Sequence, residues 1–143
     1  MNTIKIKVIN KNAKIPTQAT PHSSGYDVYS SEDFLLKKKS SGMISTGIIL
    51  EMEEGMEAQV RPRSGLAAKN GITVLNSPGT IDSDYRGEVK VILINHSNED
   101  FNITIGMRIA QIVFAKVEKV ELKLTEEVNN TIRSKGGFGS TGI

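Results

Sequence analysis

The sequence contains no cysteine and no tryptophan, and aromatic residues make up only 5% of its 143 positions. A chain without cysteine forms no disulfide, has no cysteine nucleophile and holds no zinc through thiolates, so we expect a cytoplasmic protein. It has no apolar run of about 18 residues, and its first residues lack the apolar core of a secretion signal, so we expect no membrane contact. A net charge of +2 gives no case for a nucleic-acid surface.

Several common catalytic patterns are missing as well. The sequence has neither the G-x-S-x-G turn of a serine hydrolase nor the G-x-x-x-x-G-K-[ST] phosphate loop. The two histidines, His22 and His96, are far apart and lack the spacing of metal ligands. Gly137, Gly139 and Gly142 match G-x-G-x-x-G, but a dinucleotide site needs a helix after this motif. Only Ile143 follows, which excludes that site.

An alternation of apolar and polar residues dominates the chain and predicts β-strands. It covers residues 4–8, 56–61 and 101–105, and a period of two gives each strand one buried and one wet face. The runs Val89–Ile94 and Ile109–Val113 are more continuously apolar, which is typical of strands covered on both faces. Turn signals separate the runs: Ser40-Ser41-Gly42, Glu53-Glu54-Gly55, Asn70-Gly71, Pro78-Gly79 and Asn98-Glu99-Asp100. Many short strands with regular turns predict an all-β sandwich or barrel in one domain.

Helical signals are few. Ser64–Lys69 predicts one short helix with Ser64 as its N-cap, whereas Thr125–Ile132 predicts an irregular segment or a very short helix. We expect a folded domain over residues 1–132. Residues 133–143 are glycine-rich and have no apolar period, so they predict a mobile C-terminal arm.

The arm also carries the groups of a site for a phosphate and a base. No acidic residue follows Glu127, and glycines let backbone N–H groups converge on an anion. Ser140 and Thr141 add hydroxyl donors, and Arg133 can bind a phosphate through two N–H groups. The ring of Phe138 can stack on a base. A disordered tail without function is the alternative.

Three further segments place polar groups among apolar runs. Pro62–Ala67 opens the predicted helix, where free N–H groups, the charge of Arg63 and the hydroxyl of Ser64 favour an anion; simple capping is the alternative. Ser24–Asp27 is a turn that ends in an acid. Gln111 lies inside an apolar strand, where a buried amide needs partners either in the core or in a site.

The segment Pro78–Glu88 is dense in acidic residues. Asp82 and Asp84 share a face if the chain is extended there. One carboxylate can take a proton from a water molecule, and the other can pair with Arg86. Tyr85 can present its ring to a sugar. A polar hairpin turn with a surface ion pair is the alternative.

Together these segments resemble the five motifs of the trimeric deoxyuridine triphosphatase (dUTPase) family. They stand in the family's order from Ser24 to Gly142: SGYD (24–27), PRSGLA (62–67), GTIDSDYRGE (79–88), RIAQ (108–111) and GGFGSTG (136–142). Each motif alone is moderately specific, but five in order at fitting intervals leave little room for chance. This resemblance, rather than the periodicity, predicts the function.

The resemblance implies an all-β, jelly-roll-like β-barrel of the β-clip type with one short helix. It implies a homotrimer whose three active sites each use segments of all three chains. The activity would be that of a dUTP diphosphatase, which hydrolyses dUTP to dUMP and pyrophosphate by Mg²⁺-assisted attack of water on the α-phosphorus. That reaction keeps uracil out of DNA and supplies dUMP for thymidylate synthesis. The substrate phosphates and waters near Asp27 would hold the Mg²⁺, without a direct protein ligand.

The resemblance also implies roles for individual residues. Asp82 would orient and activate the attacking water, Asp27 would organise the phosphate-binding groups, and Tyr85 would pack under the deoxyribose and exclude a 2′-hydroxyl. A hairpin from about Leu75 to Ile81 would recognise uracil. Asn76, Gly79 and Ile81 would contact the uracil, and Arg63, Ser64, Gly65 and Gln111 would bind the α- and β-phosphates. The arm would close over the substrate: Phe138 would cover the uracil, Gly139 would add a contact, and Arg133, Ser140 and Thr141 would reach the γ-phosphate.

The chain departs from the family pattern at one place, and other functions compete. The family's arm begins Arg-Gly, whereas Ser134 and Lys135 follow Arg133 here, which changes the backbone freedom of the lid. The nearest alternative is a deaminase of dCTP, which has a related fold. A second is a non-catalytic module that senses dUTP or binds a protein. A structural jelly-roll protein would leave the arm unexplained.

Overall fold

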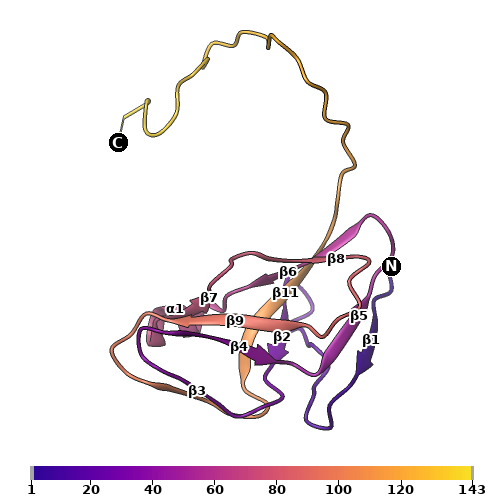
Figure 1. Cartoon of the computed structure of the whole chain (residues 1–143), viewed down its shortest axis with the longest axis vertical. Helices are drawn as coiled ribbons and strands as arrows, with labels where there is room; N and C mark the ends of the chain where they lie inside the picture. The colour runs from indigo at the N-terminus through magenta and orange to yellow at the C-terminus, as the bar shows by residue number, and fades with distance from the viewer. Residues whose placement is uncertain (1, 143) are drawn as a thin grey trace.

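The chain folds into a β-barrel of short strands, from which the C-terminal segment extends as an arm (Figure 1). The computed structural model describes residues 2–142, and Ile143, the last residue of the predicted arm, lies outside them. In this part of the chain there are eleven strands and one helix, and every strand pairing is antiparallel. None of its helices is long and apolar enough to cross a bilayer.

The strands form four small sheets around one core. Two of them are pairs, β1 (Lys5–Val8) with β5 (Ile48–Glu51), and β3 (Phe34–Leu36) with β10 (Phe101–Ile103). A three-stranded sheet has the order β4 (Ser41–Ser45), β9 (Lys90–Asn95), β7 (Ile72–Val74). A four-stranded sheet has the order β2 (Tyr26–Tyr29), β11 (Arg108–Lys116), β6 (Met56–Arg61), β8 (Gly79–Asp82). The helix α1 (Ser64–Asn70) connects β6 to β7.

The core is apolar, and every strand except β1 places a buried apolar side chain in it. The predicted alternation is clear in β6, which buries Ala58 and Val60 while Glu57 and Gln59 face outward. Each fully buried valine, leucine or isoleucine contributes about 1.5–3 kcal/mol to folding. The predicted all-β barrel with one short helix is therefore confirmed.

The helix begins where it was predicted, but its cap differs. Its N-cap is Arg63, which makes no side-chain capping hydrogen bond, so the prediction that Ser64 caps the helix is wrong. Ser64 is instead the first helical residue. The helix ends at Asn70 because Gly71 adopts a left-handed conformation with φ of 64°, which glycine tolerates without a steric penalty.

The turn predicted at Ser40-Ser41-Gly42 is misplaced. It lies at residues 37–40, where the N–H of Ser40 donates to the carbonyl of Lys37 at 3.3 Å, and Gly42 belongs to β4. The glycine is there because the ring of Phe34 packs against the strand: a Cβ at position 42 would lie 2.5 Å from Phe34 Cζ. Gly42 is therefore explained by the close approach of the Phe34 side chain and not by a turn.

The two continuously apolar runs have different explanations. β9 alternates, and leaves Ile92 and Ile94 only half-buried on its outer face, so the prediction that both its faces are covered is wrong for a single chain. In β11 the neighbours Ile109 and Ala110 are both buried because the pairing register with β2 shifts between Arg108 and Ala110. Such a β-bulge adds one residue to a strand and changes which side chains share a face.

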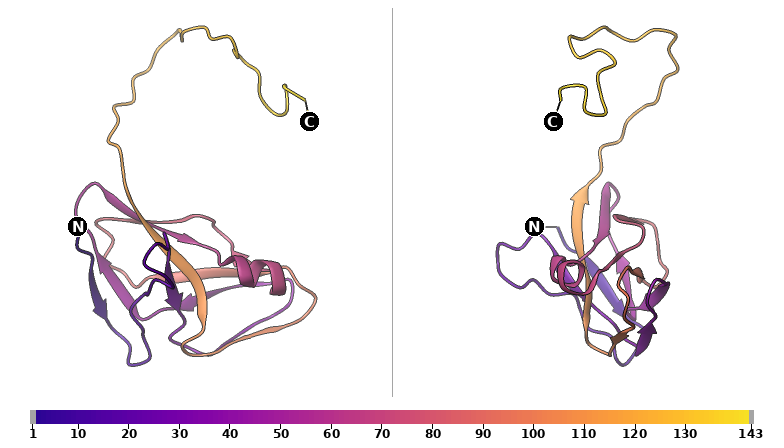
Figure 2. Two further views of the ribbon diagram at one scale, coloured as in Figure 1. Left: turned by 180° about the vertical axis from the view of Figure 1, so that it is seen from behind. Right: turned by 90° about the vertical axis from the view of Figure 1, so that its left-hand side faces the viewer.

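Beyond β11 the chain leaves the barrel. The N–H of Val117 donates to the carbonyl of Gly55 at 2.9 Å, which is the last backbone hydrogen bond to the barrel in the region that the structure describes. The following segment arches away from the strands in every view (Figures 1 and 2). Residues 125–132 form no helix, as the irregular alternative predicted.

Candidate active site

Asp27, Arg63 and Gln111 come together on the four-stranded sheet. Gln111 on β11 lies opposite Asp27 on β2 and opposite Arg61 on β6. Asp27 Oδ1 accepts a hydrogen bond from Arg63 Nε at 3.0 Å, and Gln111 Nε2 donates to the carbonyl of Pro62 at 3.0 Å. The Asp27 side chain is only 15% exposed, so it holds the Arg63 guanidinium firmly. The remaining N–H groups of a guanidinium fixed in this way suit a phosphate.

Arg108 joins this group, although no role was predicted for it. Its Nη1 lies 3.4 Å from Asp27 Oδ2. In a regular strand Arg108 and Gln111, three residues apart, would face opposite sides. The bulge in β11 turns both toward Asp27. Arg108 is part of the RIAQ motif in the sequence, but an alternating pattern cannot reveal the extra residue that a β-bulge inserts into the strand.

Close packing and the start of the helix complete this group. A Cβ at Gly25 would lie 2.0 Å from Gln111 Oε1, so only glycine lets the Gln111 amide lie against β2. Ser64 and Gly65 are exposed in the first turn of α1, directly after Arg63. Backbone N–H groups in a first helical turn have no partner within the helix. The predicted phosphate-binding residues therefore lie together.

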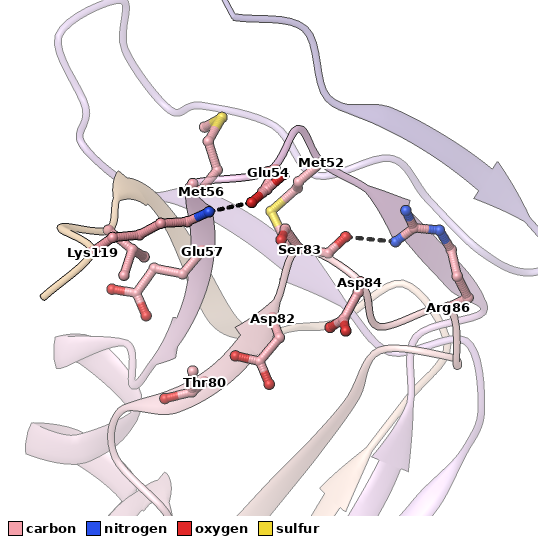
Figure 3. A pocket seen from close by; sticks show the side chains of 12 residues that line it. Met52, Glu54, Met56, Glu57, Thr80, Asp82, Ser83, Asp84, Arg86 and Lys119 are labelled. Carbon is pink, nitrogen blue, oxygen red and sulfur yellow. Dashed lines mark hydrogen bonds and ion pairs between the residues drawn. The ribbon is translucent and has the colours of Figure 1, made fainter. Parts of the chain in front are cut away.

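Asp82 lies at the end of β8 in a surface cavity of about 870 Å³ (Figure 3). Its side chain is exposed, and its carboxylate has no hydrogen-bond or ion-pair partner within residues 2–142. Asp84 lines the same cavity. The prediction that one of these two carboxylates pairs with Arg86 is wrong, because Arg86 Nη1 donates instead to the carbonyls of Ser83 and Tyr85 at 2.7 and 3.1 Å.

The charges in this cavity do not balance. Lys119 forms an ion pair with Glu54 (Figure 3), and this hydrogen bond and charge lower the pKa of Glu54. Glu57, Asp82 and Asp84 line the same cavity without a cationic partner among the described side chains. Across residues 2–142, no three histidine, aspartate or glutamate side chains are grouped closely enough to hold a metal ion.

Tyr85 points to a different cavity from Asp82. Its hydroxyl donates to the carbonyl of Glu88 at 3.1 Å, and its ring lies against Gly87, where a Cβ would be 2.4 Å from Tyr85 Cζ. With Met43 and Ile92 it lines a cavity of about 510 Å³. The ring is thus held at two points beside apolar side chains.

The segment predicted as a uracil-binding hairpin is a connection between two sheets. β7 pairs with β9 and β8 with β6, so the predicted hairpin geometry is wrong, while the uracil contact stays a prediction. Asn76 is exposed, and a Cβ at Gly79 would lie 3.3 Å from Asn76 Nδ2. Ile81 is 8% exposed and belongs to the core, so only its backbone can contact a ligand.

A single chain does not bring all the predicted site residues together. Asp82 lies opposite Glu57, which is four residues along β6 from Arg61, or about 13 Å. The predicted arm residues are exposed: Arg133, Phe138, Gly139, Ser140 and Thr141. Where the arm is described, its hydrogen bonds are local, such as Arg133 Nε to the carbonyl of Gly136 at 2.9 Å. The group of Asp27, Arg63 and Gln111 predicted to bind phosphate, the Asp82 cavity and the arm are thus three separate parts of one chain.

Comparisons with known proteins agree on one family. The family model described as dUTPase matches residues 11–142. The deoxyuridine 5′-triphosphate nucleotidohydrolase of Helicobacter hepaticus is 53% identical over 140 residues, which cover 98% of this chain and 89% of that protein. That of Nautilia profundicola is 55% identical over 139 residues, which cover 97% and 98%. The solved dUTPase of Staphylococcus bacteriophage 80alpha with dUPNHPP has a TM-score of 0.92 at 26% identity and is covered completely, as is this chain.

Proposed function

The chain belongs to the dUTPase family, and we propose that it hydrolyses dUTP to dUMP and pyrophosphate. The observation that carries the proposal is the Arg63 guanidinium, which Asp27 holds beside Gln111 and the first turn of α1. This arrangement is a preformed site for phosphates. The choice of deoxyuridine rests on the two relatives described above, both of which are nucleotidohydrolases of deoxyuridine triphosphate.

Hydrolysis of a triphosphate needs neutralised charge, fixed position and an aimed water. In the proposed site, Arg63, Gln111 and the N–H groups of Ser64 and Gly65 bind the α- and β-phosphates. Asp27 contributes by orienting Arg63. Because two oxygens of a phosphate can accept two parallel hydrogen bonds from a planar guanidinium, this contact fixes the orientation as well as the position of the substrate.

Asp82 supplies the base. An unpaired, exposed carboxylate can accept a proton from a water molecule in the transition state. Tyr85 packs under the deoxyribose, and Asn76, Gly79 and the backbone of Ile81 contact the uracil. The arm then closes over the nucleotide, with Phe138 on the base, which excludes bulk water and completes the site.

Mg²⁺ fits the donors that the chain offers. The available side chains are carboxylates, which are the hard oxygen ligands that Mg²⁺ prefers while it keeps several waters. Both oxygens of Asp27 are engaged, one by Arg63 and one by Arg108, so Asp27 would contact the ion through water. When bound, Mg²⁺ neutralises charge on the phosphates.

We further propose that the chain assembles as a homotrimer with shared active sites. The separation of the three parts of the site within one chain supports this. The exposed segment after β11 supports it too: Val120, Leu122 and Leu124 alternate with charged residues and are 75%, 91% and 104% exposed. An apolar row with a period of two is typical of a strand that packs against a partner. Neighbouring copies would cover it.

Mixing two inactive variants tests the shared sites. Asp82→Asn and Arg63→Ala chains are expected to be nearly inactive alone. After joint unfolding and refolding at equal amounts, we expect about a quarter of wild-type turnover, because a site that draws its halves from different chains at random is then intact in that fraction. Activity that stays at the level of the separate variants would show that each chain builds its own site.

The nucleotide and the products test the function itself. Purified protein is incubated with Mg²⁺ and separately with dUTP, dCTP, dTTP and UTP, and pyrophosphate and ammonia are measured. We expect pyrophosphate from dUTP alone. Ammonia from dCTP would identify the alternative deaminase, and binding of dUTP without turnover would identify a sensing module.

Tyr85→Ala is expected to lower the preference for dUTP over UTP at least about tenfold, because a packed ring excludes the 2′-hydroxyl and a methyl group does not. The measurement is kcat/KM for both nucleotides. Tyr85→Phe is the matched control, since it keeps the ring and loses only the hydrogen bond to Glu88. Unchanged selectivity in Tyr85→Ala would mean that another group excludes the ribose.

A further inference from the structure

Glu57 occupies an unfavourable position in the four-stranded sheet. It lies directly opposite Asp82 in the pairing of β6 with β8, and both side chains face the same cavity (Figure 3). Residues in this relation have their Cβ atoms about 4.5–5.5 Å apart, and like charges there destabilise a sheet. Two acidic residues that lie directly opposite each other without a cationic partner therefore need a functional explanation.

Glu57 is held in place, whereas Asp82 is not. Gln59 Nε2 donates to Glu57 Oε1 at 2.6 Å. Gln59 Oε1 in turn accepts hydrogen bonds from Arg61 Nη2 at 2.7 Å and Nε at 3.2 Å. These three residues alternate along β6 and form a polar ladder on its outer face. Because these hydrogen bonds hold Glu57, Asp82 is the side chain that is free to turn away from the repulsion between the two carboxylates.

The sheet order determines the side to which the Asp82 carboxylate can turn. β8 is the last strand of its sheet, so one side of it is β6 and the other is a free edge. Repulsion from Glu57 keeps the Asp82 carboxylate off β6 and turns it toward this edge. The two cations of the cavity do not draw the Asp82 carboxylate back, because Arg86 donates to backbone carbonyls and Lys119 pairs with Glu54.

We propose that Glu57 is a positioning residue for Asp82: its fixed carboxylate keeps the Asp82 carboxylate off β6 and directed at the attacking water. The inference rests on the proposed function, in which Asp82 activates that water. It adds a residue outside the predicted site, together with Gln59 and Arg61, which hold it.

A thermal-stability cycle tests the contact independently of activity. Glu57→Gln is expected to raise Tm by about 1–3 °C in the wild type, because it removes the repulsion. In an Asp82→Asn background the same substitution is expected to leave Tm unchanged, because the repulsion is already absent. An equal gain in both backgrounds, or no gain in the wild type, overturns the proposal.

Kinetics test the consequence for turnover. Glu57→Gln is expected to lower kcat for dUTP about threefold to fivefold, the rate equivalent of a facing like-charge pair, with KM unchanged because the phosphate-binding group lies elsewhere. Glu57→Asp keeps the charge and is expected to keep most of kcat. Glu53→Gln removes the same charge from the adjacent turn, outside the cavity, and is the matched control with wild-type kcat.

The outcomes separate the two hypotheses. If the wild type hydrolyses dUTP and Glu57→Gln has wild-type kcat, the positioning role fails and the proposed function stands. If the wild type releases no pyrophosphate from dUTP, the proposed function fails and the positioning role falls with it. A gain in Tm combined with a loss of kcat supports the inference, since a residue with a purely structural role would not move these two quantities in opposite directions.

Discussion

Asp82→Asn is expected to slow dUTP turnover at least about 10²-fold and to leave dUTP binding largely intact. The amide has nearly the shape of the carboxylate but cannot accept the proton of the attacking water. The substitution breaks no hydrogen bond or ion pair, because within the described residues the Asp82 carboxylate has no partner. Steady-state release of pyrophosphate measures turnover, and calorimetry with the variant measures binding.

Asp84→Asn is the matched control for this substitution. It removes the same charge from the same cavity two residues later, and we expect it to keep most of the turnover. Near-normal turnover in Asp82→Asn would refute the role of general base. A loss of the same size in both variants would mean that the total charge of the cavity matters, and not the aim of one carboxylate.

Removal of residues 133–143 is expected to lower kcat/KM for dUTP by about 10²-fold or more, because the loss takes away the arginine and hydroxyl donors at the γ-phosphate as well as the cover over the base. The thermal unfolding temperature of the barrel is expected to be unchanged. Within residues 133–142 the arm makes only local hydrogen bonds, as at Arg133 and Ser140, and Phe138 is fully exposed.

Phe138→Ala separates the contribution of the aromatic ring from that of the phosphate donors in the arm. It keeps the phosphate donors and removes only the ring, so we expect a smaller loss that falls mainly on KM. A truncated protein with full activity would show that the arm is not a lid. A truncated protein that unfolds at a lower temperature would show that the arm contributes to the folded assembly.

Much of the fold could be predicted from a period of two. Met56–Arg61 alternates in the sequence and forms β6 with that alternation intact, because a strand exposes one face and buries the other. The turn at Asn70-Gly71 was equally readable, since a left-handed residue that ends a helix favours glycine. The residues proposed to bind phosphate were identified through the family resemblance of their motifs, and their role, like the cytoplasmic location, stays a prediction.

Features that depend on register or on distant packing could not be read in this way. The bulge before Ala110 decides that Arg108 and Gln111 face the same carboxylate, yet it leaves no mark in an alternating pattern. Gly42 was taken for a turn because the ring that excludes a Cβ there belongs to Phe34, on another strand. The partner of Arg86 was mispredicted because nearby backbone carbonyls compete with the carboxylate of Asp84.

The exposed row of Val120, Leu122 and Leu124 also affects the newly made polypeptide. An alternating segment with free backbone groups is a template for β-sheet growth between identical molecules, the first step toward amyloid. Glu121 and Lys123 sit between the apolar residues and act as gatekeepers against that growth. In the proposed trimer neighbouring copies would cover this row, so we expect the protein to be most prone to aggregate between its synthesis and its assembly.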